Sequence, residues 1–267
     1  MTKTNQQKVK DFLINNGVII VMFILVIYTG FTSDNFFTKN NFMNILMNMS
    51  SRLVIALGIA GCVITAGCDL SAGRMIGFGA CISGMLLQRM DYSGKFFPDM
   101  QPLNVFVVAL IAMLVCAAFG TVTGFFIAYL NVPPFIATLA MMEIVYGIGL
   151  IVTNATPLGG YVEQYTNVSN GKFLGINYLI WIAIIVAAIT WFIFNMTRHG
   201  KYMYAIGGNP QAAEVAGVPV KATLILIYMK AAAMYGLAGF MLGAKAGGAS
   251  VQTGYGYEME AIAACTI

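Results

Sequence analysis

The sequence predicts an all-α polytopic membrane protein, built as a bundle of transmembrane helices. Hydrophobic residues make up 59% of the 267 residues and charged residues only 9%, whereas soluble domains carry roughly 25% charged residues. Several apolar runs approach the roughly 20 residues that a helix needs to cross a bilayer, and short polar segments separate them. A soluble fold of this length would need more charged surface, so the composition excludes one.

Seven spans are predicted from these apolar runs. They lie near residues 12–32, 44–65, 74–90, 103–130, 136–153, 178–196 and 222–243. The fourth run is too long for one perpendicular helix, so we expect it to be tilted, or broken around Gly120 and Gly124. The segment from Glu258 is a candidate for the start of an eighth span.

The basic residues predict the orientation of the spans. The first apolar run resembles a signal sequence, but the residues after it, FTSDNFF, contain no small-x-small cleavage site. We therefore expect an uncleaved first span with the N-terminus in the cytoplasm. Basic residues are then more numerous on the cytoplasmic side than outside, as the positive-inside rule requires. The cytoplasmic set is Lys3, Lys8, Lys10, Arg74, Arg198, Lys201 and Lys221, and the outer set is Lys39, Arg89, Lys95 and Lys172.

Glycines spaced four apart predict close helix contacts, because small residues let helix backbones approach each other in lipid. Such spacing occurs in or beside three of the predicted spans. The sets are Gly73 with Gly77, Gly120 with Gly124, and Gly239 with Gly243 and Gly247.

Missing motifs exclude several classes of chemistry. The chain has no GxxxxGK(S/T) phosphate loop and no HExxH zinc motif, and no serine or cysteine has a histidine available for a nucleophilic triad. His199, the single histidine, cannot form a metal site alone, and the five cysteines without CxxC spacing are interpreted as small buried hydrophobes. The net charge of +4 is dispersed, without the basic cluster that nucleic acid would require. We expect no catalytic residue, no metal site and no nucleic-acid partner.

The predicted cytoplasmic segment 197–221 contains a short helix whose two ends are marked. Asn209 is suited to cap its N-terminus and Pro210 to its first position, while Gly217 and Pro219 end it. Two interpretations remain open on the spacing alone: a loop that is helical, or an element that docks into a groove on a partner. The apolar residues expected on its surface beside Glu214 are Ala212, Ala213, Val215 and Ala216.

Four stretches of the sequence carry a family resemblance. They are HGKYMYAIGGNPQAAEVAGV (199–218), TAGCDLSAGR (65–74), NVPPFIATLAMMEIVYG (131–147) and YEMEAIAAC (257–265). They resemble the permease subunits of bacterial ABC sugar importers, in the group that serves ribose, xylose and galactose. The resemblance runs the whole length of the chain and looks closest to the members that carry galactose and methyl-galactoside.

The resemblance implies a function and partners. The chain would pass a monosaccharide across the bacterial inner membrane, surrounded by lipid, together with a second permease copy, an ATP-binding subunit and a periplasmic sugar-binding protein. ATP and Mg would bind to the partner ATPase, so this chain would hold no cofactor. The capped helix would be the coupling helix that docks on the ATPase. Its coupling residues would be Gly207, Gly208, Asn209, Pro210, Ala212, Ala213, Glu214 and Gly217.

The sequence departs from the family pattern at two places. It ends at Ile267, within a block that relatives continue, so we expect residues 1–267 to be a single permease domain that is truncated. In addition, Glu143 and Lys230 lie inside apolar spans where relatives look uncharged.

Polar residues near the ends of spans are candidates for a pathway or gate. Asp69 and Ser71 are predicted to cap the third span, with a gating role as the alternative. The polar opening of the second span, from Asn44 to Arg52, serves equally well as inter-helix contact or as a sugar pathway. Pro133 and Pro134 begin the fifth helix or hinge a gate. The candidate pathway residues are Asn48, Ser51, Asp69, Ser71, Pro134 and Phe135.

Glu143 and Lys230 are a candidate intramembrane ion pair. Each lies seven to nine residues into a span that begins on the cytoplasmic side, which places both roughly 10–14 Å deep. The alternative is that each contacts backbone carbonyls or pathway water separately. The same two charges support a rival function, a secondary transporter driven by an ion gradient. A structural or signalling subunit without transport is the other rival.

Overall fold

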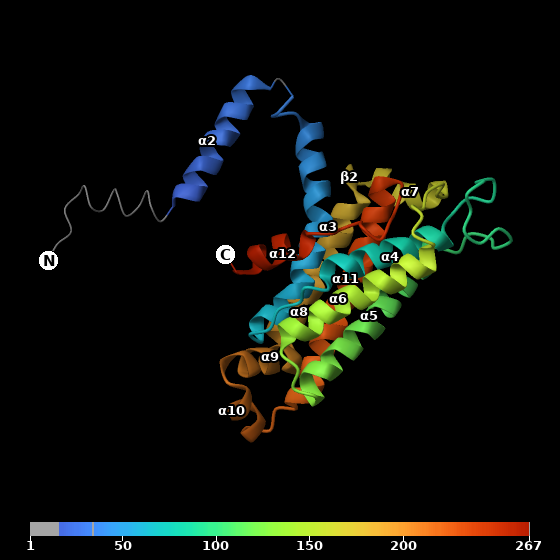
Figure 1. Cartoon of the computed structure of the whole chain (residues 1–267). Helices are drawn as coiled ribbons and strands as arrows, with labels where there is room; N and C mark the ends of the chain where they lie inside the picture. The colour runs from blue at the N-terminus through green and yellow to red at the C-terminus, as the bar shows by residue number, and fades with distance from the viewer. Residues whose placement is uncertain (1–15, 34, 267) are drawn as a thin grey trace, which may run out of the picture. The chain divides into compact units, whose positions relative to one another are not determined.

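The chain is almost entirely helical in the part that the structure describes. This computed structural model describes residues 16–33 and 35–266, and only the backbone of Val18. The elements, in chain order, are α2 (Gly17–Thr32), α3 (Lys39–Ile64), α4 (Ala72–Leu86), α5 (Val105–Tyr129), α6 (Pro134–Thr153), α7 (Glu163–Asn170), β1 (Lys172–Phe173), β2 (Ile176–Asn177), α8 (Tyr178–Met196), α9 (Arg198–Gly208), α10 (Pro210–Val215), α11 (Val220–Ala246) and α12 (Tyr257–Thr266) (Figure 1). The two strands pair antiparallel as a short hairpin before α8.

Two compact units make up the chain, residues 1–46 and 47–267. In the first unit, α2 carries exposed large hydrophobic side chains along its length, including Phe23, Leu25 and Ile27. A helix that is apolar all round is typical of a membrane span. The predicted first span begins at residue 12, and its residues before 16 lie outside the described residues, as do Lys3, Lys8 and Lys10.

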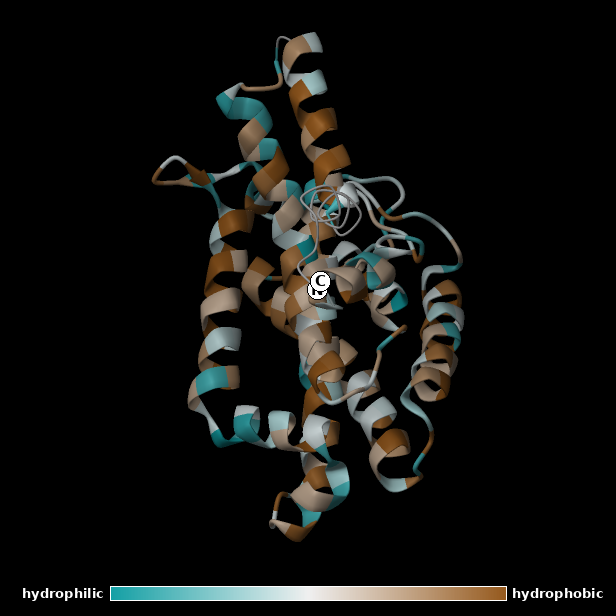
Figure 2. Cartoon of the chain, turned by 90° about the vertical axis from the view of Figure 1, so that its left-hand side faces the viewer, coloured by the Kyte–Doolittle hydropathy of each residue, from teal (hydrophilic) through white to brown (hydrophobic). Residues whose placement is uncertain are grey.

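The predicted all-α polytopic architecture is confirmed. Five of the described helices are long and apolar enough to cross a membrane: α3, α5, α6, α8 and α11. Hydrophobic residues run along these helices, whereas α9, which lies across the lower end of the bundle in Figure 2, is more hydrophilic. The chain is therefore a multi-pass membrane protein.

Two of the predicted spans differ from the helices observed. The third, predicted at 74–90, is α4, whose 15 residues extend only about 22 Å, less than the roughly 30 Å hydrocarbon core. The fourth is the single unbroken helix α5, so the predicted break around Gly120 and Gly124 is wrong. A Cβ on Gly120 would lie 2.5 Å from the Ala232 Cβ of α11. These glycines permit close packing instead of breaking the helix.

The centre of residues 47–267 is α11, which packs most extensively against α5 and next against α4 (Figure 1). A Cβ on Gly239 would collide with the backbone of α4, at the Ile76 carbonyl oxygen and the Ala80 nitrogen, and Gly243 faces the Tyr165 hydroxyl. The predicted glycine contacts are thus confirmed at both positions. Gly247 has a different role, because it ends α11 with a φ of 65° and no neighbour near its Cβ position.

The segment after α11 packs beside α4. Its backbone pairs with the polar segment 154–177 through Ala249 and Leu158, which exchange two hydrogen bonds of 2.8 and 2.9 Å. It then runs along the N-terminal half of α4, where a Cβ on Gly77 would lie 2.8 Å from the Val251 carbonyl oxygen. Residues 247–256 therefore connect α11 to α12 along α4.

Candidate functional site

The segment between α8 and α11 forms the short capped helix that the sequence predicts. Asn209 has extended backbone angles, and its side-chain oxygen accepts a hydrogen bond of 3.0 Å from the backbone N–H of Ala212. Pro210 occupies the first helical position. The predicted N-cap is therefore confirmed.

The C-terminus of α10 is closed by a left-handed glycine. Gly217 has a φ of 82°. Its N–H donates to the Glu214 carbonyl, and the N–H of Val218 donates to the Ala213 carbonyl, both at 3.0 Å. These two bonds make a Schellman motif, which satisfies carbonyls that the helix end would leave unpaired. Both ends of α10 are fixed by local hydrogen bonds.

One predicted surface residue of α10 is buried. Ala213 is only 4% exposed, so the prediction that it lies on the docking face is wrong. The reason is that a helix of six residues packs one side against α9, and Ala213 is on that side. Val215 is 91% exposed. We define the α10 surface by its exposed residues: Ala212, Glu214, Val215 and Ala216.

Close backbone contact holds α9 against the end of α3. A Cβ on Gly207 would collide with the carbonyl oxygen of Ile64, the last residue of α3, whereas the neighbouring Gly208 has nothing within 4 Å. Met203 and Ile206 of α9 are buried. Burial, together with the charge of Lys230, lowers the pKa of His199 on α9 to about 4, so this imidazole is neutral at pH 7. The capped helix α10 therefore follows a helix, α9, that is held against α3 by buried side chains and a close backbone contact.

Asp69 and Ser71 form a buried hydrogen-bonded turn before α4. Asp69 Oδ1 accepts from the Ser71 backbone N–H at 3.0 Å and from its hydroxyl at 2.6 Å. Asp69 Oδ2 accepts from the Tyr235 hydroxyl of α11 at 3.1 Å. The Ser71 side chain makes no capping bond to α4, so the prediction that it caps the helix is wrong: its hydroxyl is bonded to Asp69 instead.

The other pathway candidates are dispersed. Asn48 of α3 accepts a hydrogen bond from Lys245 of α11, and Ser51 is buried. Pro134 begins α6, and Phe135 beside it is more than half exposed. The structure does not bring these residues together with Asp69, so a common pathway for them stays a prediction.

Glu143 and Lys230 do not form the predicted ion pair. In the described part of the chain the ion pairs are Arg52–Glu260 at 2.6 Å and Arg89–Asp91 at 3.6 Å. Glu143 is exposed on α6, whereas Lys230 lines a small cavity with residues of α8 and α9. The similar depth predicted for the two residues was therefore not sufficient to make their side chains pair.

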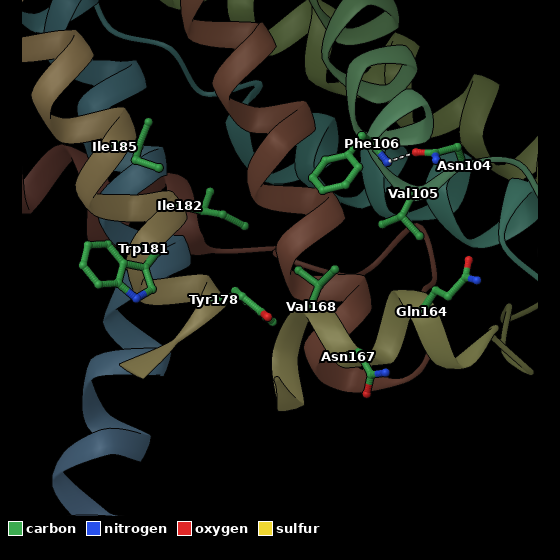
Figure 3. Close-up of a pocket in the computed structure, with 10 residues that line it drawn as sticks. All are labelled: Asn104, Val105, Phe106, Gln164, Asn167, Val168, Tyr178, Trp181, Ile182 and Ile185. Atoms are coloured by element: carbon green, nitrogen blue, oxygen red, sulfur yellow. Dashed lines mark hydrogen bonds between the residues drawn. The ribbon is translucent and has the colours of Figure 1, made fainter. Parts of the chain in front are cut away.

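The cavity in Figure 3 lies at the end of α8 that is remote from α9. It encloses about 590 Å³ between the N-termini of α5 and α8 and the short helix α7. Asn104 caps α5 at its rim by accepting from the Phe106 N–H at 2.9 Å. Its lining contains none of the residues that the sequence predicts for the pathway. It is lined by Asn104, Val105, Phe106, Gln164, Asn167, Val168, Tyr178, Trp181, Ile182 and Ile185.

The position of Arg74 differs from the one predicted from the sequence. Its guanidinium carbon lies 3.9 Å from the ring centroid of Tyr146. Tyr146 is the thirteenth residue of α6, about 18 Å along the helix from Pro134. Arg74 is therefore at mid-height in the bundle, and counting it among cytoplasmic loop charges is wrong. An arginine at the start of an apolar run looks the same in sequence whether that run begins at the membrane surface or inside.

Comparison with known proteins assigns the chain to a family. The family described as "Branched-chain amino acid transport system / permease component" matches residues 41–267. The chain belongs to this permease family. Permease components are transport subunits without an ATPase site of their own, so this permease is a transport subunit and not an ATP-hydrolysing enzyme.

Curated relatives of this permease are sugar import proteins. It is 38% identical, over its whole length and 82% of the relative, to the galactose/methyl galactoside import permease protein MglC of Escherichia coli. The MglC protein of Haemophilus influenzae is 40% identical over the same shares. The ribose import permease protein RbsC of Escherichia coli is 31% identical over 97% of this permease and 78% of that protein. No solved structure matches this permease significantly.

Proposed function

We propose that this permease passes a monosaccharide, galactose or methyl-galactoside, across the bacterial inner membrane, driven by ATP hydrolysed on a separate subunit. The observation that carries the proposal is the similarity to the MglC proteins over the whole length of this chain. The helical architecture with several membrane-crossing helices fits that function. Branched-chain amino acids, named in the family description, are the alternative cargo that a transport assay must test.

The proposed contact with the ATPase is the α10 surface. A rigid, exposed helix with small apolar side chains can enter a groove on a partner, and its two locked ends limit the conformational entropy lost on docking. Asn209, Pro210 and Gly217 would act by fixing the shape of α10, and Gly207 by fixing α9 against α3. Gly208 and Glu214 are exposed and would lie at the contact.

The proposed partners follow from the same assignment. ATP and Mg would be held by the ATPase chain, and this permease would bind no cofactor itself. A second permease copy would complete the membrane part, and a periplasmic sugar-binding protein would deliver the cargo. The proposed orientation places the N-terminus and α10 in the cytoplasm and the cavity of Figure 3 on the outer side.

Sugar uptake tests the proposed function. The permease is expressed together with an ATPase subunit and a periplasmic sugar-binding protein, in cells that lack their own galactose and ribose importers. We expect uptake of radiolabelled methyl-galactoside that stops when ATP is depleted. Uptake that survives ATP depletion while the ion gradient is intact would support a secondary transporter instead. Uptake of leucine without any sugar would assign the cargo differently, and no uptake of either would support a structural subunit.

The orientation makes a separate prediction about labelling with impermeant thiol reagents. Gln211 on α10 and Gln164 on α7 are both exposed. We expect Gln211→Cys to react only after the cytoplasmic face is opened, and Gln164→Cys to react in intact spheroplasts. The unmodified permease, with its native cysteines buried or partly buried, serves as the control for background labelling. Reaction of the two variants from the opposite sides would overturn the proposed orientation.

A further inference from the structure

Arg74 of α4 is partly buried and is held by residues from two other segments, α6 and the segment after α11. Its guanidinium carbon lies over two tyrosine rings, 3.9 Å from the centroid of Tyr146 and 4.3 Å from that of Tyr255, within the range of cation–π attraction. Arg74 Nη1 donates to Gln252 Oε1 at 2.7 Å and to the Val251 carbonyl at 3.4 Å. Gln252 Nε2 in turn donates to the Tyr146 hydroxyl at 3.1 Å. We call Arg74, Tyr146, Gln252 and Tyr255 the Arg74 cluster.

At the depth of this cluster, the charge of Arg74 has a high free-energy cost. Because Arg74 lies beside the thirteenth residue of α6, it is near the middle of the membrane, where an arginine costs about 2.5–3.5 kcal/mol on insertion scales. No carboxylate forms an ion pair with it among residues 16–33 and 35–266. Charged residues retained at such depth generally face a water-filled cavity or a substrate path. The cluster therefore points to a functional role.

The groups that remain free in the cluster define what it could bind. Tyr255 is 60% exposed, and its hydroxyl makes no hydrogen bond with the described residues. The guanidinium carbon lies over two tyrosine rings, Nη1 is occupied, and Nε is buried without a partner in the described structure. Nη2 is thus the remaining donor group of Arg74 that a ligand can reach.

This pattern of donors favours hydroxyls over carboxylates. Arginine recognises a carboxylate best through two parallel N–H donors on adjacent nitrogens, and the two edges that could offer them are blocked at Nη1 and at Nε. A single guanidinium nitrogen beside a phenol hydroxyl, which both donates and accepts, suits an uncharged molecule rich in hydroxyl groups. The exposed ring of Tyr255 adds an apolar face beside these polar groups.

We infer that the Arg74 cluster is a contact site for the transported sugar in the middle of the membrane, with Arg74 Nη2 and the Tyr255 hydroxyl hydrogen-bonding to its hydroxyl groups. The inference rests on the proposed function and adds the residues that meet the cargo. Tyr146 and Gln252 position the guanidinium, and Tyr255 both positions it and contacts the sugar. The contact is transient, since tight binding at this point would slow release.

The test uses the complete importer, with ATPase and binding protein, in proteoliposomes. Tyr255→Phe removes the hydroxyl but keeps the ring against Arg74, and Arg74→Lys keeps the charge but removes the planar donor group. We expect each to lower the amount of methyl-galactoside delivered per ATP hydrolysed about two- to tenfold, the effect of one lost hydrogen bond. Protein amount in the membrane and stimulation of the ATPase by loaded binding protein should stay at the wild-type level for Tyr255→Phe.

A second readout separates contact with the sugar from a structural role. Singly deoxygenated galactose analogues lack one hydroxyl each, and Tyr255→Phe should remove the wild-type preference for galactose over one of them. The matched control is Tyr129→Phe, since Tyr129 also lies beneath a cation, with Lys221 Nζ 5.2 Å from its ring centroid, and it is the last residue of α5. This control should leave delivery and preference unchanged.

Several results would overturn the inference. Unchanged delivery and preference in both cluster variants, with an active wild type, would exclude the contact and leave the proposed function intact. Loss of Arg74→Lys from the membrane with a silent Tyr255→Phe would make the cluster a structural cross-link. A wild-type importer that moves no sugar would overturn the proposed function and this inference together.

Discussion

Gly239→Ala should destabilise the permease, and Gly147→Ala should stabilise it slightly. Both glycines lie inside membrane helices, Gly239 in α11 and Gly147 in α6. Alanine is favoured over glycine in a helix by about 0.8–1.0 kcal/mol, so each change begins with the same local gain. A Cβ at Gly147 meets nothing within 4 Å, whereas a Cβ at Gly239 collides with the Ile76 carbonyl oxygen and lies 2.7 Å from the Ala80 nitrogen.

The collision at Gly239 cannot be relieved by a side-chain rotation, because both atoms belong to the backbone of α4. Overpacking of this kind costs about 1–3 kcal/mol or more, which outweighs the helix propensity and separates α4 from α11. The measurement is the thermal midpoint of the detergent-solubilised permease, together with its amount in the membrane. Equal midpoints for Gly239→Ala and Gly147→Ala would contradict the packing of α4 on α11.

The sequence was sufficient to predict the features that are determined by residues close together in the chain. The apolar runs predicted the long helices because span length is set by bilayer thickness. Asn209, Pro210 and Gly217 predicted both ends of α10, since a cap needs only residues within one turn of it. The predicted contacts at Gly239 and Gly243 were also confirmed, although the sequence did not identify α4 and Tyr165 as their partners.

Features set by tertiary packing could not be predicted in this way. Ala213 and Ala212 are adjacent and identical, and only the packing of α10 against the rest of the chain makes the first buried and the second exposed. A break around Gly120 is one of two alternatives that the sequence leaves open, because glycine has the same low helix propensity whether it bends a helix or accepts a neighbour. The position of Arg74 depends on the depth in the bundle at which α4 begins after α3. The residues around Arg74 in the sequence do not determine that depth.

Contacts run continuously from the α10 surface towards the Arg74 cluster. α10 packs on α9, and Gly207 of α9 abuts Ile64 at the end of α3. The turn that follows holds Asp69, which is bonded to Tyr235 of α11, and leads directly into α4 and Arg74. A displacement of α9 therefore acts on the segment that positions α4. Under the proposed function, this arrangement offers a physical connection between the ATPase and the cargo.

The second prediction with a large expected effect concerns the α10 surface. Val215→Asp should abolish the stimulation of ATP hydrolysis by loaded binding protein, while the permease still accumulates in the membrane. Val215 is 91% exposed, so the aspartate costs little in the isolated permease. In a docked complex the same carboxylate would be buried without a partner in the groove of the ATPase. Changing a hot-spot residue near the centre of an interface costs at least about 2 kcal/mol, which corresponds to roughly a thirtyfold weaker association.

The matched control places the same kind of charge elsewhere on the proposed cytoplasmic side. Ala222 is exposed in the first turn of α11, where the helix dipole favours a carboxylate, so Ala222→Glu should leave the stimulated hydrolysis unchanged. Ala212→Glu, on the α10 surface, should reproduce the defect of Val215→Asp. Ala213→Glu is unsuitable for this purpose. Ala213 is buried, so a glutamate at this position would disturb the folding of the permease. Normal stimulated hydrolysis in both Val215→Asp and Ala212→Glu would exclude α10 as the docking helix, because a buried unpaired charge could not leave the interface intact.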